Sequence, residues 1–386
     1  TGLTALMLLA VFAATDISQA AEGRKFWQVQ NRLRVEYDDN IYQTTDNTVD
    51  SVKLIDDIYL GRTMVREQTF LGLKYRPSIV YWFDRPSDDL DLNHELLLDL
   101  NQKFTPQLSL TLKDRFLIQE MPELIDNGTP IRADTGYTYN DVVAALNYRF
   151  RPATDLDLSG RWDMIRYDED AQSTVYDNDR LVVGLSLNHY VVPETQVSGD
   201  IRLEDVAYDT DNGRDSESYY LGLGVAQTFS PNLLGSLRGG YQFKQFSGST
   251  LEDNDSPYAD LALTWVPAAA TRVSAGLGYA MDSSYTAAYA NQERLQYFAT
   301  LAHDFTAKIA WYLSGNFTDS AYDAKESVVE GAVDADEDFV LISTRVTYRL
   351  DNTNSLDFSY SYTDFSSDIR TEYDRSRVSV GWRVQI

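Results

Sequence analysis

The sequence predicts an all-β fold, an up-and-down antiparallel transmembrane β-barrel of about 18 strands. The clearest sign is the final segment, residues 373–386, in which apolar and basic side chains alternate and give one strand an oily face and a charged face. The same alternation recurs along the chain with no helical pattern or linker in between. Connections are alternately short and long, as in outer-membrane barrels, where short periplasmic turns alternate with longer external loops.

The composition suits a barrel and excludes several other classes of protein. Beyond the amino-terminal segment no apolar run approaches the roughly 18 residues of a membrane helix. The mean hydropathy of −0.36 is expected if only alternate residues face lipid. The chain has no cysteine, which excludes disulfides and cysteine metal sites, and its 26 tyrosines suit aromatic girdles. A net charge of −26 argues against nucleic acid as a partner.

The amino-terminal segment is predicted to be a secretory signal peptide rather than part of the fold. Leu3–Ala14 is an apolar run too short to span a bilayer, and the small residues of Ser18–Ala21 follow it. Cleavage is expected after Ala20 or Ala21. Residues 1–21 are then removed, and residues 22–386 form a single outer-membrane β-barrel domain.

The expected strands pair into hairpins around short turns. Five of these turns hold a proline, which cannot donate to a strand ladder and so ends the strand. Phe104, Phe150, Phe229 and Phe305 each precede a turn by one or two positions, where a ring would lie at the inner membrane interface. The expected strands are Phe26–Tyr37, Val52–Val65, Thr69–Phe83, Asp91–Phe104, Gln107–Gln119, Tyr137–Arg151, Thr154–Tyr167, Asn178–Val192, Thr195–Tyr208, Glu217–Phe229, Asn232–Phe246, Tyr258–Val266, Thr271–Asp282, Gln292–Phe305, Lys308–Ser320, Glu337–Leu350, Asn354–Phe365 and Tyr373–Ile386.

The strand number also predicts how the barrel closes and how it is oriented. An even number with short turns on one side places both termini in the periplasm. Pairing of the first strand with the last removes the sheet edge, which lipid would not tolerate. Residues 52–65 and Lys113–Arg115 alternate poorly, and a slip of one residue there would reverse their faces.

Charge is distributed unevenly between connections and strands. Most acidic residues fall in long connections, for example Asp168–Asp170 and Glu252–Asp255, and these loops are expected to be solvated. The arginines predicted to line the lumen, as candidates for contact with a solute, are Arg32, Arg34, Arg76, Arg149, Arg161, Arg202, Arg238, Arg272, Arg294, Arg345, Arg349, Arg375, Arg377 and Arg383. They either pair with inward acids such as Asp200 and Asp357 and stiffen the wall, or form a surplus that attracts an anion.

No catalytic residue, cofactor or metal site is predicted. His94, His189 and His303 are the only histidines, and they are expected at outward positions far apart in the chain. The Gly-Leu-Gly sequences at residues 222–224 and 276–278 lie inside strands with no helix after them. They are therefore interpreted as glycines that relieve crowding in the wall, not as a phosphate cradle.

The end of the first strand carries a local motif. Residues 35–42, Val-Glu-Tyr-Asp-Asp-Asn-Ile-Tyr, run from a strand into a loop and resemble the porin-like outer-membrane β-barrel proteins associated with exopolysaccharide export operons. The signal peptide and the series of hairpins are similar too, so the resemblance covers the mature chain. It implies movement of a polymer or small solutes across a Gram-negative outer membrane, with periplasmic export proteins as partners. The final Ile386 departs from the aromatic residue that usually ends such barrels.

These observations predict a non-enzymatic conduit that is embedded in outer-membrane lipid. The first hypothesis is export of an extracellular, acidic polysaccharide, whose acidic groups the inward arginines contact. One alternative is a diffusion porin for general solutes, sugars or small anions, since a barrel of this size can hold a water-filled channel. Another is a structural or adhesive surface barrel. The state of the lumen, the solute and the oligomeric state stay open at this point.

Overall fold

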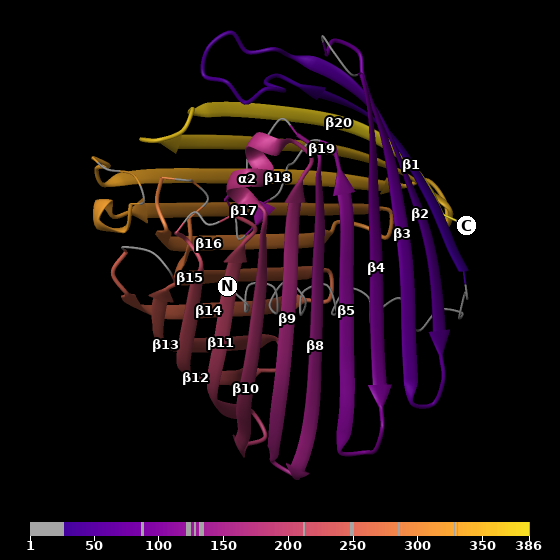
Figure 1. The fold of residues 1–386 in the computed structure, drawn as a ribbon. Coiled ribbons are helices and arrows are strands. Elements are labelled where there is room, and N and C mark those ends of the chain that lie inside the picture. The colour runs from indigo at the N-terminus through magenta and orange to yellow at the C-terminus, as the bar shows by residue number, and fades with distance from the viewer. Residues whose placement is uncertain are drawn as a thin grey trace.

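The computed structural model is a closed β-barrel (Figure 1). It describes residues 27–85, 89–120, 125–126, 129–130, 135–210, 213–247, 251–284, 286, 288–327, 329 and 331–385, so the predicted signal peptide and its cleavage site lie outside the described residues. Among these residues no helix is long and apolar enough to cross a membrane. The barrel strands are β1 (Trp27–Asp38), β2 (Ser51–Val65), β3 (Thr69–Trp82), β4 (Leu90–Lys103), β5 (Leu108–Gln119), β8 (Tyr137–Arg151), β9 (Thr154–Tyr167), β10 (Asn178–Val192), β11 (Thr195–Tyr208), β12 (Ser216–Ser230), β13 (Leu233–Phe246), β14 (Asn254–Ala268), β15 (Thr271–Ser283), β16 (Asn291–Asp304), β17 (Ile309–Tyr322), β18 (Ala335–Arg349), β19 (Asn354–Ser367) and β20 (Tyr373–Gln385).

The strands form one 18-stranded sheet, which confirms the predicted fold class and strand number. Neighbours pair antiparallel throughout, and β5 pairs with β8 across a small separate hairpin of β6 (Ile125–Asp126) and β7 (Thr129–Pro130). The barrel closes where indigo β1 pairs with yellow β20 in Figure 1, in a register that ends with Asp38 opposite Arg377. Every strand of this sheet therefore has two partners, as a membrane barrel requires.

Some boundaries and elements differ from the sequence expectation. Strand β14 begins before the predicted Tyr258, because its pairing with β13 continues to Lys244 opposite Asn254. Asp38, which lies beyond the predicted end of the first strand, is instead the last residue of β1, because its backbone pairs with β2 on one side and β20 on the other. Its side chain is fully buried. In the described parts of the long connections there are also two unpredicted short helices, α2 (Asp170–Tyr176) and the 3-10 turn η1 (Ala324–Glu326).

The outward face of the wall is apolar, as the alternation predicts. On β12, for example, the outward Leu221 and Leu223 are 62 % and 74 % exposed. The phenylalanines predicted at the inner interface are exposed too, beside the short turns; they are Phe104, Phe150, Phe229 and Phe305. The outward face therefore matches a lipid environment.

The three histidines lie on the outward face, as predicted, and on three separated strands. Each ring contacts a hydroxyl of a neighbouring strand: His94 with Tyr75 at 2.8 Å, His189 with Thr154 at 3.0 Å and His303 with Thr271 at 2.8 Å. Because they are on β4, β10 and β16, the histidines do not share a site.

Glycines in the wall make room for an inward ring. The Tyr258 ring crosses β13 and β12, where a Cβ on Gly240 would lie 2.7 Å from it and a Cβ on Gly222 would lie 2.1 Å from its hydroxyl. A Cβ on Gly276 would likewise lie 2.3 Å from the ring of Phe298. Real Cβ atoms do not approach so closely, so the interpretation of these glycines as relief of crowding is confirmed for Gly222 and Gly276.

Inward side chains are packed more tightly near the long loops than near the short turns. Towards the long loops, Lys53, Gln242 and Gln292 are only 4 %, 1 % and 1 % exposed. Towards the short turns, Arg345 and Arg149 are exposed. The wall is therefore most accessible to solvent in the short-turn half of the barrel.

Candidate functional site

The candidate site is the inward face of the wall. The arginines predicted to line the lumen all lie on this face, at positions that alternate with the exposed apolar series; on the closing strands, for example, Arg32 lies opposite Arg383. They are Arg32 and Arg34 on β1, Arg76 on β3, Arg149 on β8, Arg161 on β9, Arg202 on β11, Arg238 on β13, Arg272 on β15, Arg294 on β16, Arg345 and Arg349 on β18, and Arg375, Arg377 and Arg383 on β20.

Many of these arginines form ion pairs with carboxylates of the wall. The pairs are Arg34–Glu36 at 3.2 Å, Arg76–Glu95 at 2.6 Å, Arg149–Asp155 at 2.8 Å, Arg161–Asp141 at 2.9 Å, Arg202–Asp200 at 3.6 Å, Arg294–Asp282 at 2.6 Å and Arg375–Asp38 at 2.5 Å, together with Arg32–Asp357 and Arg238–Asp200. The interpretation of a mixed-charge lumen therefore describes most of the wall. The buried members of this set, such as Arg294–Asp282 and Arg375–Asp38, fix side-chain positions more surely than they add stability.

Inward cations outside the predicted set of arginines include Arg180, Arg115 and Lys53. Arg180 contacts Asp163 at 3.0 Å, and Arg115 contacts Glu95 at 2.8 Å. Lys53 lies on the poorly alternating β2. Arg180 is two residues from the inward Asn178, and Arg115 is four residues from the inward Gln119. Strict alternation therefore predicts that both arginines point inward.

An arginine–tyrosine cluster occupies the inward face of β11 to β14. Asp200, 5 % exposed, accepts from Arg238 Nε at 2.9 Å and lies 3.6 Å from Arg202. The Arg202 guanidinium lies over two rings, 4.5 Å from the centroid of Tyr220 and 5.0 Å from that of Tyr258. One carboxylate and two aromatic faces therefore hold two arginines, an arrangement that stabilises cations in a partly dry setting.

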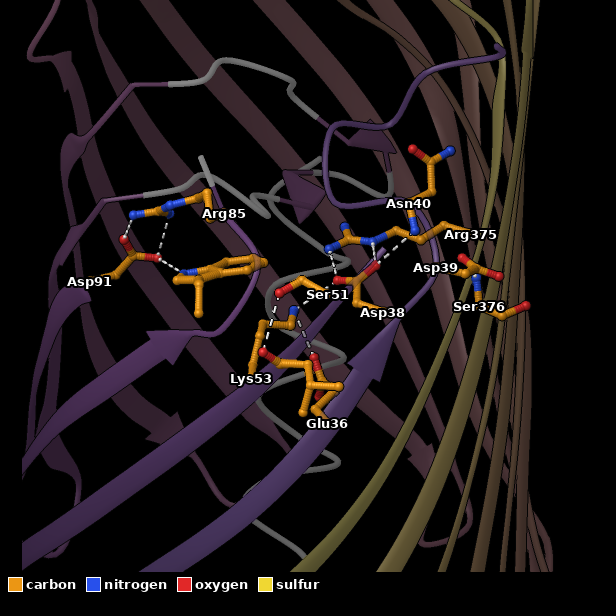
Figure 2. A network of polar contacts seen from close by, with 12 residues as sticks. Glu36, Asp38, Asp39, Asn40, Ser51, Lys53, Arg85, Asp91, Arg375 and Ser376 are labelled. Carbon is orange, nitrogen blue, oxygen red and sulfur yellow. Dashed lines mark hydrogen bonds and ion pairs between the residues drawn. The ribbon is translucent and has the colours of Figure 1, made fainter. Parts of the chain in front are cut away.

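A second cluster joins the first and last strands near the long loops (Figure 2). It consists of Asp38, Lys53 and Arg375 and is called the closing network below. Arg375 donates to both oxygens of Asp38, at 2.9 and 2.5 Å, and the Lys53 ammonium lies 2.8 Å from Asp38 and 2.9 Å from Glu36. All three residues of the closing network are at most 4 % exposed. The network therefore ties β20, β1 and β2 through side chains as well as through the backbone.

The residues that follow Asp38 extend this junction into the loop. Asp39 donates its amide to the Ser376 carbonyl at 3.2 Å and accepts the Ser376 amide at 2.7 Å. The Asn40 side chain donates to the carbonyls of Asp374 at 2.9 Å and Thr44 at 2.8 Å. The Asp-Asp-Asn sequence of the local motif therefore links the end of the first strand, β1, to the last strand, β20.

Three basic residues of the long connections, Arg370, Arg85 and Arg214, fold back onto the wall. Arg370 donates to both oxygens of Glu337 at 2.6 Å. Burial lowers the pKa of Arg370, but the hydrogen bond and charge of Glu337 outweigh it and raise the pKa overall. Arg85 contacts Asp91 at 2.6 Å (Figure 2), and Arg214 donates to the Ser284 carbonyl at 2.6 Å.

The four closing strands, β18, β19, β20 and β1, carry more inward arginines than inward carboxylates. Their seven arginines are Arg345, Arg349, Arg375, Arg377, Arg383, Arg32 and Arg34, and their four carboxylates are Glu337, Asp357, Glu36 and Asp38. Each carboxylate is already engaged by Arg370, Arg32, Lys53 or Arg375. Arg345 and Arg383 form no ion pair with any described residue, and Arg383 Nε has no hydrogen-bond partner there.

Comparison with known proteins places this geometry in a family. A family model described as "Putative beta-barrel porin 2" matches residues 177–386, more than half of the chain. Pseudomonas aeruginosa OpdK, solved with vanillate, has a similar fold, with 11% identity, a TM-score of 0.51, and 93% of this chain and 99% of that chain covered.

Acinetobacter baumannii OccAB4 is also similar in fold, with 10% identity, a TM-score of 0.51, and 95% of this chain and 100% of that chain covered. No curated protein matches the chain. The chain is therefore an outer-membrane β-barrel porin and belongs to the family described as Putative beta-barrel porin 2.

Proposed function

We propose that the protein is a diffusion porin whose lumen favours small anions over neutral solutes of similar size. The observation that carries the proposal is the excess of arginine on the closing strands. Arg345 is exposed and Arg383 is half-buried, and both lack a carboxylate partner among the described residues. They keep guanidinium groups available for a passing anion.

The electrostatics of this part of the wall favour a carboxylate or phosphate solute. Arg345, Arg383 and Arg32 surround Asp357, whose charge is already engaged by Arg32. A unit negative charge about 4 Å from a guanidinium gains about 1–4 kcal/mol, depending on how much water separates them. That is enough to enrich an anion and weak enough to release it, as passage requires.

The orientation of the protein follows the usual arrangement of porins. Both ends of the described chain, Trp27 and Gln385, lie at the short-turn end, which we assign to the periplasm. The accessible half of the wall, with Arg345, Arg349 and Arg149, then faces the periplasm.

The sequence favours polysaccharide export as the first hypothesis and a diffusion porin as an alternative. The diffusion porin has more support. The family match concerns porins, and it carries no information about a polysaccharide. Partner proteins for export are likewise an implication of the sequence resemblance alone. We therefore assign an acidic polymer the role of a competing solute in the test below.

Liposome swelling tests the proposal. Proteoliposomes should swell faster in vanillate or glucuronate than in neutral glucose. Replacement of Arg345 and Arg383 by glutamine should lower this anion preference about fivefold, because loss of about 1 kcal/mol of attraction changes a rate by that factor. Vanillate is a suitable solute because OpdK, a protein of similar fold, was solved with it.

A matched control removes the same charge from the other face. Arg62 and Arg166 are outward, so their double replacement by glutamine should leave the anion preference unchanged. Equal swelling in anionic and neutral solutes by the unmodified protein contradicts the proposal. Uptake of an acidic oligosaccharide in preference to its monomer would favour polymer export instead.

A further inference from the structure

Two carboxylates lie on the outward face, inside its apolar band. Asp56 on β2 is outward, because the adjacent Asp57 is inward and contacts Arg34 and Ser78. Asp114 on β5 is outward, because the adjacent Arg115 is inward and contacts Glu95. In the outward series, two large apolar residues flank each carboxylate on both sides. They are Val52, Leu54, Ile58 and Leu60 for Asp56, and Leu110, Leu112, Phe116 and Ile118 for Asp114.

Each carboxylate accepts a hydrogen bond from an asparagine of the neighbouring strand. Asn31 Nδ2 donates to Asp56 at 2.5 Å, and Asn140 Nδ2 donates to Asp114 at 2.7 Å. These residues are called the outward Asn–Asp pairs below. All four are part-exposed, so the chain itself does not cover them.

The other outward acids are placed differently. Examples are Asp205, Asp319, Asp338 and Asp364, and each has a single alanine or polar residue between it and the long-loop end in the outward series. Such positions lie near the headgroups, where charge is tolerated. Among the outward acidic residues of the described strands, only Asp56 and Asp114 have two large apolar neighbours on each side in the outward series.

A carboxylate in contact with acyl chains is expensive, and one hydrogen bond satisfies only part of it. Ionisable groups inside a membrane normally face protein or water and pair with other polar groups. Polar side chains that meet between membrane segments are stabilised by hydrogen bonds across the contact. The outward Asn–Asp pairs therefore indicate a surface that protein covers.

The two pairs bound a continuous face of six barrel strands, β1, β2, β3, β4, β5 and β8. Strands β2 and β5 are about 14 Å apart, at about 4.8 Å per strand. Between them, Tyr75 on β3 lies opposite Leu96 on β4, and the Tyr75 hydroxyl contacts His94. The face holds amide donors and carboxylate acceptors on both sides of a leucine-rich centre, so it is complementary to itself.

We propose that this face is the contact between two copies of the chain, related by a two-fold axis along the membrane normal near β3 and β4. Such an isologous contact brings the β1–β2 side of one copy towards the β5–β8 side of the other. The Asn140 amide already donates to the Arg115 carbonyl at 3.3 Å as well as to Asp114, whereas Asn31 has a second N–H, which then donates to a carboxylate of the partner subunit. The proposal concerns the outward face, so it is independent of solute preference.

Cysteine cross-linking in native outer membranes tests the proposal, since the chain has no cysteine of its own. Leu96→Cys places one thiol at the centre of the proposed contact, and oxidation should trap a dimer. Leu261→Cys on β14, also outward and apolar, is the matched control and should stay monomeric. Absence of the Leu96→Cys dimer, or equal cross-linking of both variants, overturns the proposal.

Removal of the polar groups gives the second test. The variant Asn31→Leu, Asp56→Leu, Asp114→Leu, Asn140→Leu should form a folded barrel, because leucine suits a lipid-facing position. Its dimer dissociation constant in nanodiscs should rise at least about tenfold, as expected for the loss of hydrogen bonds between protein segments inside a membrane. The control Asp319→Leu, Asp364→Leu should dimerise like the unmodified protein. Unchanged dimerisation of the fourfold variant overturns the assignment of the pairs.

Discussion

Replacement of Asp38 by asparagine is expected to lower the free energy of unfolding of the barrel by about 3–5 kcal/mol, the usual effect of breaking a buried ion pair. Asp38 is fully buried and accepts from both Arg375 and Lys53. Asparagine keeps the size of the side chain but loses the charge and one acceptor. Arg375, 4 % exposed, is then left as a buried cation without its carboxylate.

Urea titration of the protein in lipid vesicles measures this effect. The adjacent Asp39→Asn variant is the matched control, because Asp39 binds the Ser376 amide and asparagine can still accept that hydrogen bond. We expect a change below about 1 kcal/mol for the control, as for a neutral hydrogen bond that is kept. Equal stability of the two variants would show that the closing network does not hold β20 to β1.

Replacement of Asp200 by asparagine is expected to lower the free energy of unfolding by about 3 kcal/mol, because this one carboxylate interacts with two arginines. Asp200 is 5 % exposed and contacts Arg238 through both oxygens, while Arg202 lies beside it over the rings of Tyr220 and Tyr258. Without the carboxylate the two guanidinium groups repel each other inside the wall, and Arg202 is held by the rings alone.

Thermal unfolding provides the measurement. The fraction of folded protein after heating is followed on a gel, where the folded barrel and the unfolded chain migrate differently. Asp260→Asn is the control, since Asp260 is inward on β14 and forms no ion pair or hydrogen bond with the described residues. A loss of stability for Asp260→Asn as large as that for Asp200→Asn would contradict the role of the arginine–tyrosine cluster.

The period-two pattern was sufficient to predict the barrel and the direction of its side chains. A strand in lipid must keep one face largely apolar, so the pattern persists from β1 to β20, apart from outward acids such as Asp56 and Asp114, and leaves little freedom in register. For the same reason the inward position of arginines such as Arg161 and Arg345 could be read from neighbouring residues. The α2 helix left no signal, because it buries no residue and has no side-chain cap.

Which arginines are paired could not be predicted from the sequence. Partners such as Arg32 and Asp357, or Arg375 and Asp38, are more than 300 residues apart in the chain and meet only because β1 and β20 close the barrel. The return of Arg370 to Glu337 depends in the same way on how a long loop folds. The unpaired Arg345 and Arg383 therefore emerge only from the three-dimensional structure.

The local motif at residues 35–42 illustrates both points. Its alternation marks Glu36 and Asp38 as inward, but nothing in the segment shows that Asp38 belongs to the strand. The structure gives the physical reason for the Asp-Asp-Asn order. Asp38 binds inward cations, Asp39 binds the backbone of β20, and Asn40 joins that backbone to its own loop.

The reversal potential of the purified protein in a planar bilayer under a steep KCl gradient tests the central claim most directly. The inward arginine excess on the closing strands predicts a stable current that chloride carries in preference to potassium. The reversal potential should therefore shift towards the equilibrium potential of chloride. The negative charge of the whole chain, −26, would by itself suggest the opposite. A cation-selective current, or no current from correctly folded protein, would contradict an anion-favouring porin.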